Sequence, residues 1–202
     1  MLEGVWRFEY PGEGLLEVSH LKPLLDLLVQ IEQRDLGLAF HCHRVASFST
    51  RLARVLGQTP AEVNVIRWAA LLHDVGKLRI PEAILNKKGP LNPEEWSVVH
   101  HHPAYGSEMV RERSGLTEVA LLILAHHERC NGSGYPSRLP IDKIPLGARI
   151  LAVADSYCAM TDKRVYRASL TPRQARKEIL RCTNTDFDPF VVDAFLHVVD
   201  HA

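Results

Sequence analysis

The chain has 202 residues, of which 46% are hydrophobic and 24% charged, and its 24 basic and 24 acidic side chains give a formal net charge of zero. These values fit one soluble domain with a buried core, and they exclude a global positive field for DNA or an anionic membrane. The four cysteines lack C-x-x-C spacing and no apolar run reaches the roughly 18 residues of a membrane span, so we expect a protein of the reducing cytoplasm.

Helical spacing of apolar residues runs through the chain, and strand-like alternation is nearly absent. We expect a helix at about residues 15–33 and then an amphipathic helix, whose inner stripe consists of His41, Val45, Phe48, Leu52 and Val55. The next helix begins at residues 59–62 (TPAE), which combine an N-cap, a proline at N1 and a glutamate at N3. Its apolar stripe ends at His73.

Later helices are marked in a similar way, because a proline follows their first residue. Such starts occur at Asn92, His102, Thr171 and Asp188, and helical spacing covers about residues 117–127, 147–160, 172–182 and 189–199. Residues 80–90 and 131–145 have the composition of loops. The chain therefore predicts an all-α helical bundle, with residues 1–34 as an N-terminal lead-in that holds a helix and residues 35–202 as the functional domain.

Several histidines occupy core-facing positions of these helices. His41, His73 and His126 lie on apolar stripes, and Asp155 lies one turn beyond Leu151. A lone inward histidine is usually a core residue hydrogen-bonded to a neighbour. Several imidazoles and carboxylates that converge from different helices would instead crowd groups that protonate near neutral pH, unless a cation pairs with them. Such a ligand set without thiolate favours two divalent ions of iron, manganese, zinc, nickel or cobalt over calcium or magnesium.

Two long motifs carry a resemblance to a known family. Residues 73–81 (HDVGKLRIP) resemble the core motif of HD-domain phosphohydrolases, and residues 126–136 (HHERCNGSGYP) resemble the HD-GYP signature HHExxxGxGYP. Supporting stretches at 102–103, 148–155 and 162–167 extend the resemblance over roughly residues 35–182. The resemblance implies an HD-domain helical bundle with a Gly-Tyr-Pro loop between helices. It also implies hydrolysis of the bacterial second messenger cyclic di-GMP to pGpG, and in some members on to GMP.

Carried over by position, the resemblance implies a binuclear metal centre that activates a hydroxide. Its ligands would be His41, His73, Asp74, His102, His126, His127 and Asp155, with Asp74 as the bridge and iron or manganese as the preferred metals. Lys77 would hold a phosphate oxygen, and the dinucleotide would contact Tyr135, Arg164 and Arg167. Gly37 replaces a glutamate of members with three metals, which favours two ions. Cys158 replaces a usual aspartate, which we interpret as a change next to the ligands or in packing, with a ligand role as the weaker alternative.

Plainer roles remain open for several of these residues. Lys77 is alternatively a surface lysine that caps a helix end, and Arg164 and Arg167 a solvated face. Glu128 either orients His126 or His127 or forms a salt bridge. The Gly-Tyr-Pro loop either lines the substrate pocket or only joins two helices. The remaining histidines are expected to be bystanders or surface residues: His20, His43, His100, His101, His197 and His201.

Two other functions also remain open. One is an HD hydrolase of a different phosphoester or cyclic dinucleotide. The other is a receptor without turnover, which would bind cyclic di-GMP or contact a signalling protein through the Gly-Tyr-Pro loop. A homodimer is compatible with either function, whereas DNA and membranes are not expected partners.

Overall fold

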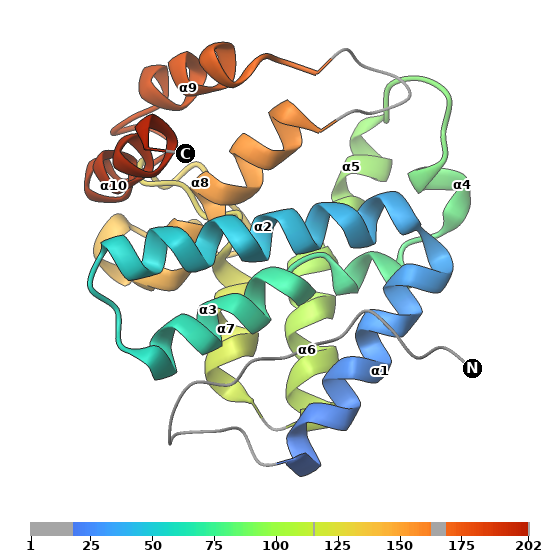
Figure 1. Cartoon of the computed structure of the whole chain (residues 1–202). Helices are drawn as coiled ribbons and strands as arrows, with labels where there is room; N and C mark the ends of the chain where they lie inside the picture. The colour runs from blue at the N-terminus through green and yellow to red at the C-terminus, as the bar shows by residue number, and fades with distance from the viewer. Residues whose placement is uncertain (1–17, 115, 163–168, 202) are drawn as a thin grey trace.

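The computed structural model describes residues 18–114, 116–162 and 169–201, and within them it contains helices and no β-strand (Figure 1). The longer helices are α1 (Val18–Arg34), α2 (Leu36–Val55), α3 (Pro60–Leu72), α6 (His102–Ser114), α7 (Thr117–Ala125), α8 (Leu146–Thr161), α9 (Pro172–Arg181) and α10 (Pro189–Asp200). Shorter elements are η1 (Val75–Arg79), α4 (Glu82–Leu85), α5 (Pro93–Val99) and η2 (Ile141–Lys143). The predicted all-α fold is confirmed.

Local capping explains why four of these helices begin where the sequence predicts. The side chains of Thr59, Asn92 and Thr171 each accept a hydrogen bond from the backbone N–H of the third helical residue. The side chain of that third residue in turn accepts a hydrogen bond from the backbone N–H of the capping residue. Asp188 accepts from the backbone N–H of Phe190. Each such cap stabilises its helix by roughly 0.5–2 kcal/mol. Helix α6 likewise begins at His102, as expected from the proline that follows it.

Two segments expected to be loops contain a short helical turn. Residues 80–90 include α4, which begins after Pro81, and residues 131–145 include η2, which begins after Pro140. A proline directly before a helical turn leaves the turn's hydrogen bonds intact, since the lost N–H would be unpaired there. The apolar stripe of α2 is also shorter than predicted, because Val55 at its end is 45% exposed.

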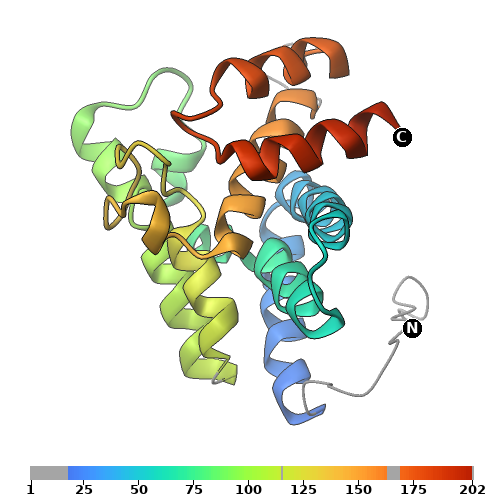
Figure 2. The same ribbon diagram turned by 90° about the vertical axis from the view of Figure 1, so that its left-hand side faces the viewer.

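Helix α2 crosses the middle of the molecule and contacts α1, α3, α8 and α10 (Figure 1). Helix α1 belongs to the same core, since Leu24, Leu27 and Ile31 are buried. Arg34 at its end donates hydrogen bonds to the carbonyl oxygens of Leu78 (2.5 Å) and Ile80 (2.7 Å), which holds α1 against η1. Figure 2 shows α9 and α10 together on one side of the molecule, where they contact α8.

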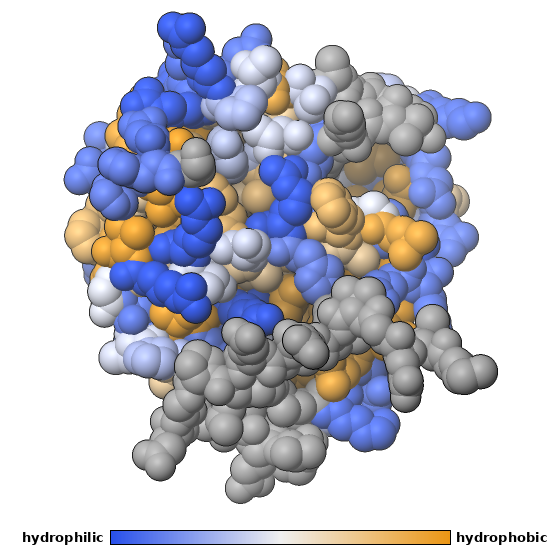
Figure 3. Space-filling view, in the orientation of Figure 1, coloured by the Kyte–Doolittle hydropathy of each residue, from blue (hydrophilic) through white to orange (hydrophobic). Residues whose placement is uncertain are grey.

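The surface mixes polar and apolar side chains. On the face shown in Figure 3, hydrophobic residues are interspersed with hydrophilic ones over most of the area that is not grey. In the described part of the chain, none of the helices combines the length and the apolar character that crossing a bilayer requires.

Candidate metal centre

Three of the predicted ligands are built into the structure in the same way. His73 and His126 directly follow the last residues of α3 and α7, and His102 lies three residues beyond the end of α5; the last carbonyl groups of a helix have no partner within it. Each ring turns back so that Nδ1 donates to the carbonyl oxygen three residues earlier. The pairs are His73 with Ala70 (2.8 Å), His102 with Val99 (2.8 Å) and His126 with Ile123 (2.6 Å).

These hydrogen bonds determine which ring nitrogen faces the interior as an acceptor. A carbonyl oxygen only accepts, so Nδ1 carries the proton and Nε2 presents its lone pair. The Nε2 atoms of His73, His102 and His126 are all buried without a hydrogen-bond partner in the described structure. An unpaired buried polar atom costs roughly 1–3 kcal/mol. A cation would supply the missing partner, and histidine ligands usually donate their other nitrogen as these do. The donor set therefore fits a metal ion.

The ligand atoms fall into three overlapping groups, each with atoms within 4.8 Å of one another. Their members are His41, His73 and Asp155 for the first, His73, Asp74 and His126 for the second, and His102, His126 and His127 for the third. The first and third groups share no residue, and the second overlaps both. The structure thus brings all seven predicted ligands into one cluster with room for more than one position that can hold a metal ion.

Asp74 lies between the outer two groups. Its Oδ2 is 3.4 Å from Nε2 of His73, and its Oδ1 is 3.3 Å from Nε2 of His102. Lys77 donates to Oδ2 at 2.6 Å. Burial alone would raise the pKa of this carboxyl, but the ammonium group of Lys77 beside it holds the pKa well below its usual range. Asp74 is therefore an ionised carboxylate whose two oxygens face different histidines, as a bridging ligand requires.

Burial also keeps the three histidines of the third group neutral. It lowers the pKa of His102 to about 4 and that of His127 to about 3, even though nearby carboxylates oppose the shift. Burial lowers the pKa of His126 well below its usual value too. At neutral pH these three rings are therefore unprotonated, which is the form that can bind a cation.

Helix α2 contributes His41, whose orientation depends on an aspartate with no role assigned from sequence. His41 Nε2 lies 3.0 Å from Oδ1 of Asp155, while Nδ1 donates to Oδ2 of Asp162 at 2.7 Å. Arg44 donates to the other oxygen of Asp162 and, at 3.0 Å, to the hydroxyl of Thr161. Asp162 therefore aims His41 at the cluster. The sequence signal for it was its place at the start of the matching stretch 162–167.

Among the described residues, Glu128 makes neither of the two contacts expected for it. Its carboxylate is buried, with the residue 2% exposed, and accepts hydrogen bonds from the backbone N–H groups of Ser137 (2.7 Å) and Leu139 (3.0 Å). It therefore fastens the Gly-Tyr-Pro loop to the end of α7 instead of orienting a histidine. The loop also approaches this backbone closely at Gly134, where a Cβ atom would lie 2.4 Å from the nitrogen of Arg129.

The glycine of the HD motif has a similar steric reason. A Cβ atom at Gly76 would lie 2.0 Å from the carbonyl oxygen of His102 and 2.6 Å from the nitrogen of Gly106. Only a residue without a side chain lets η1 lie directly on the start of α6. This contact places Asp74 and His102 side by side, so Gly76 is part of how the cluster is assembled.

The remaining residues singled out from the sequence lie at different distances from the cluster, and some lie outside the described residues. Tyr135 lies beside the cluster, with its ring centroid 4.8 Å from that of His127. Arg164 and Arg167, and the side chain of His20, lie outside the described residues. His197 and His201 are exposed as expected. His43, which was expected at the surface, is half-buried on α2, and this burial lowers the pKa of its ring. His100 belongs to none of the groups of ligand atoms, as expected, and its ring stacks on Tyr135.

Neither of the two departures from the family pattern belongs to the groups of ligand atoms. Gly37 is an exposed residue in the first turn of α2. Cys158 is 1% exposed, and burial raises the pKa of its thiol to about 12, so the thiol stays protonated. Among the described residues, none of the three groups includes a cysteine.

Comparison with known proteins agrees with this geometry. The model of the family described as HD domain matches residues 24–191. A cyclic di-GMP phosphodiesterase of Thermotoga maritima is 40% identical over 167 residues, which cover 82% of this chain and 45% of the relative. The 3'3'-cGAMP-specific phosphodiesterase 2 of Vibrio cholerae is 40% identical over 168 residues, 82% of this chain and 32% of the relative.

Among solved structures, Bd1817, a HDG"Y"P protein from Bdellovibrio bacteriovorus, aligns with a TM-score of 0.64 at 21% identity, over 80% of this chain and 52% of that one. This likeness supports the fold. The chain spans about a third to a half of the length of the two curated relatives it matches. Because the family model covers most of its length, the chain belongs to the HD domain family.

Proposed function

We propose that this chain is a metal-dependent cyclic dinucleotide phosphodiesterase that hydrolyses cyclic di-GMP to the linear pGpG. The observation that carries the proposal is the set of three buried, unpartnered Nε2 atoms around an ionised aspartate. The two relatives named above, both cyclic dinucleotide phosphodiesterases by name, support it. Most of the chain lies within the part that aligns with them.

The ligand groups suggest how two cations would be held. His41, His73 and Asp155 would hold one, His102, His126 and His127 the other, and Asp74 would bind both through its two oxygens. Two divalent ions, iron or manganese before zinc, nickel or cobalt, would lower the pKa of a water and offset charge on the phosphoryl group. Gly37 has no side-chain oxygen to offer a third ion, so we propose a binuclear centre.

The chain's own residues would bind and orient the substrate. Lys77 has the position and charge for a phosphate contact, since its side chain is 28% exposed and its ammonium group lies 2.6 Å from Oδ2 of Asp74. A substrate phosphate that takes over one of its hydrogen bonds would be held beside the cluster. Tyr135 would contact the dinucleotide from the loop, and we retain Arg164 and Arg167 as further contacts.

A second candidate substrate is 3'3'-cGAMP. The Vibrio cholerae relative named for it is as similar to this chain as the Thermotoga relative named for cyclic di-GMP, each at 40% identity. Both molecules present the same phosphodiester to the metal centre and differ in one purine base. Identity alone therefore does not separate them, and both belong in the test.

The test is turnover by chelator-stripped protein reloaded with manganese or iron. Chromatography would follow cyclic di-GMP and 3'3'-cGAMP, with Asp74→Ala as the inactive variant and Asp142→Asn, an exposed carboxylate, as the matched control. We expect linear dinucleotide from at least one substrate with wild-type and Asp142→Asn protein, and none with Asp74→Ala. Tight binding by calorimetry without any product would identify a receptor and refute the proposed hydrolysis.

A further inference from the structure

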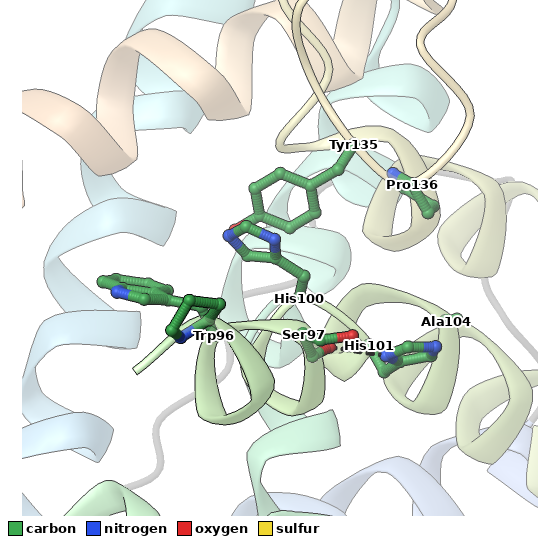
Figure 4. Close-up of a pocket in the computed structure, with 8 residues that line it drawn as sticks. Trp96, Ser97, His100, His101, Ala104, Tyr135 and Pro136 are labelled. Atoms are coloured by element: carbon green, nitrogen blue, oxygen red, sulfur yellow. Dashed lines mark hydrogen bonds between the residues drawn. The ribbon is translucent and has the colours of Figure 1, made fainter. Parts of the chain in front are cut away.

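A row of aromatic rings leads from the metal-ligand cluster to the surface. The Tyr135 ring lies 4.8 Å from His127 on one side and stacks on His100 on the other, with centroids 4.2 Å apart and ring planes 25° apart. Trp96 follows, 5.5 Å from His100. We refer to Tyr135, His100 and Trp96 as the ring row. Figure 4 shows His100 in front of the Tyr135 ring, with Trp96 on the neighbouring turn of α5.

The ring row borders an open pocket of about 360 Å³. Trp96 is 49% exposed, so a large apolar ring faces water, and His100 is exposed as well. The pocket is also lined by Ser97, His101 and Pro136, and its described lining contains no lysine or arginine. A pocket with ring faces and without cations suits a planar, uncharged group and does not suit a phosphate.

Both sides of the ring row are held in place by hydrogen bonds. On one side, the capping box of Asn92 and Glu95 fixes the start of α5, and Lys87 donates to Glu95 at 2.6 Å. On the other, the backbone N–H of Tyr135 donates to the carbonyl oxygen of His127 at 3.2 Å. A surface that is ordered before binding loses less entropy when a ligand packs on it.

A cyclic dinucleotide carries two purine bases, each one sugar away from a phosphate. If a phosphate lies at the metal-ligand cluster, the base on the adjoining sugar must lie just outside the cluster. The ring row begins there, because Tyr135 is the ring next to that of His127. Bases stack on aromatic side chains whatever their identity, because every base has a π face.

We propose that the ring row and its pocket form the subsite for one purine base of the substrate, with His100 and Trp96 as the residues that position it. This inference rests on the proposed function and adds to it the place of a base. Tyr135 had been expected to contact the dinucleotide, whereas His100 and Trp96 had been given no role.

The test compares His100→Ala and Trp96→Ala with two controls. His100→Phe keeps a ring at the same place, and His201→Ala removes an exposed histidine at the end of α10. Binding of cyclic di-GMP to the metal-loaded protein is followed by quenching of tryptophan fluorescence on rapid mixing, before turnover. KM and kcat are measured with the reloaded protein. The unfolding midpoint of each variant checks the fold.

We expect both alanine variants to weaken binding of cyclic di-GMP and raise KM roughly tenfold, the usual effect of losing one base–aromatic stack, with a smaller change in kcat. His100→Phe should stay within about twofold of wild type, and His201→Ala should match it. In protein that also carries Trp6→Phe, most of the quenching should disappear in Trp96→Phe, since the remaining Trp68 is buried.

The outcomes separate the subsite from the proposed function. Wild-type affinity and KM in both folded alanine variants would overturn the subsite while leaving the hydrolysis intact. Binding that is quenched at Trp96, without turnover of any dinucleotide, would support the subsite and refute the hydrolysis. If cyclic di-GMP and 3'3'-cGAMP neither bind nor react, both proposals fail.

Discussion

Replacing Asp162 by asparagine tests whether a residue outside the metal-ligand set controls one of its two halves. The Asp162 side chain is only 10% exposed, and both of its oxygens accept hydrogen bonds, one from Nδ1 of His41 and one from Arg44. An amide has a single acceptor oxygen, so in Asp162→Asn its NH₂ group must face one of two donors. One charge-assisted hydrogen bond is therefore lost, at a cost of about 1.5–3 kcal/mol.

That loss should appear in metal affinity. Outer hydrogen-bond partners of ligating histidines typically contribute 10–100-fold to affinity, and only the half that contains His41 depends on Asp162. Competition with a chromophoric chelator should therefore show one binding step of Asp162→Asn weakened by about 10–100-fold, and the other unchanged. Asp200→Asn, which alters an exposed ion pair with Arg176, is the matched control. If folded Asp162→Asn binds metal in both steps like the wild type, Asp162 does not orient a ligand.

Two further predictions concern stability. Glu128→Ala removes two hydrogen bonds to a buried carboxylate and should lower the free energy of unfolding by about 2–4 kcal/mol. Amide exchange should also become faster at Ser137 and Leu139. Glu112→Ala, at an exposed position, is the control, and equal stability of the two variants would contradict the loop contact. In metal-free protein, His102 has a pKa of about 4, below the roughly 6.5 of an unfolded histidine, so the unfolded state binds more protons between these values. Urea denaturation should therefore show stability falling by about 1.4 kcal/mol per pH unit for each such histidine as pH drops from 6.5 to 4, and a flat profile would refute their burial as neutral rings.

The helices and the ligand residues follow from local sequence because their signals are local. The caps at Thr59, Asn92 and Thr171 involve residues three apart, so a short stretch of sequence determines them. The inward position of His41 and His73 follows from the spacing of apolar residues on a single helix. Both are buried as predicted, with 6% and 1% of each residue exposed.

The contacts that tune the site depend on distant parts of the chain. Asp162 reaches His41 across 121 positions, and no spacing rule links α2 to the end of α8. The sequence predicts for Glu128 either a contact with the histidines next to it or a salt bridge, yet its carboxylate accepts hydrogen bonds from the backbone of Ser137 and Leu139 in the following loop. His100 stacks on Tyr135 because that loop passes over α5. Sequence motifs identify such residues, whereas only the tertiary fold determines their partners.

The central claim is that a binuclear centre bridged by Asp74 hydrolyses a cyclic dinucleotide. The most direct measurement titrates chelator-stripped protein with manganese and follows bound metal and turnover of cyclic di-GMP and 3'3'-cGAMP in the same samples. We predict saturation at two ions per chain, with linear product forming as the second ion binds. Full turnover with one ion, saturation at three ions, or two bound ions without any product would contradict the claim.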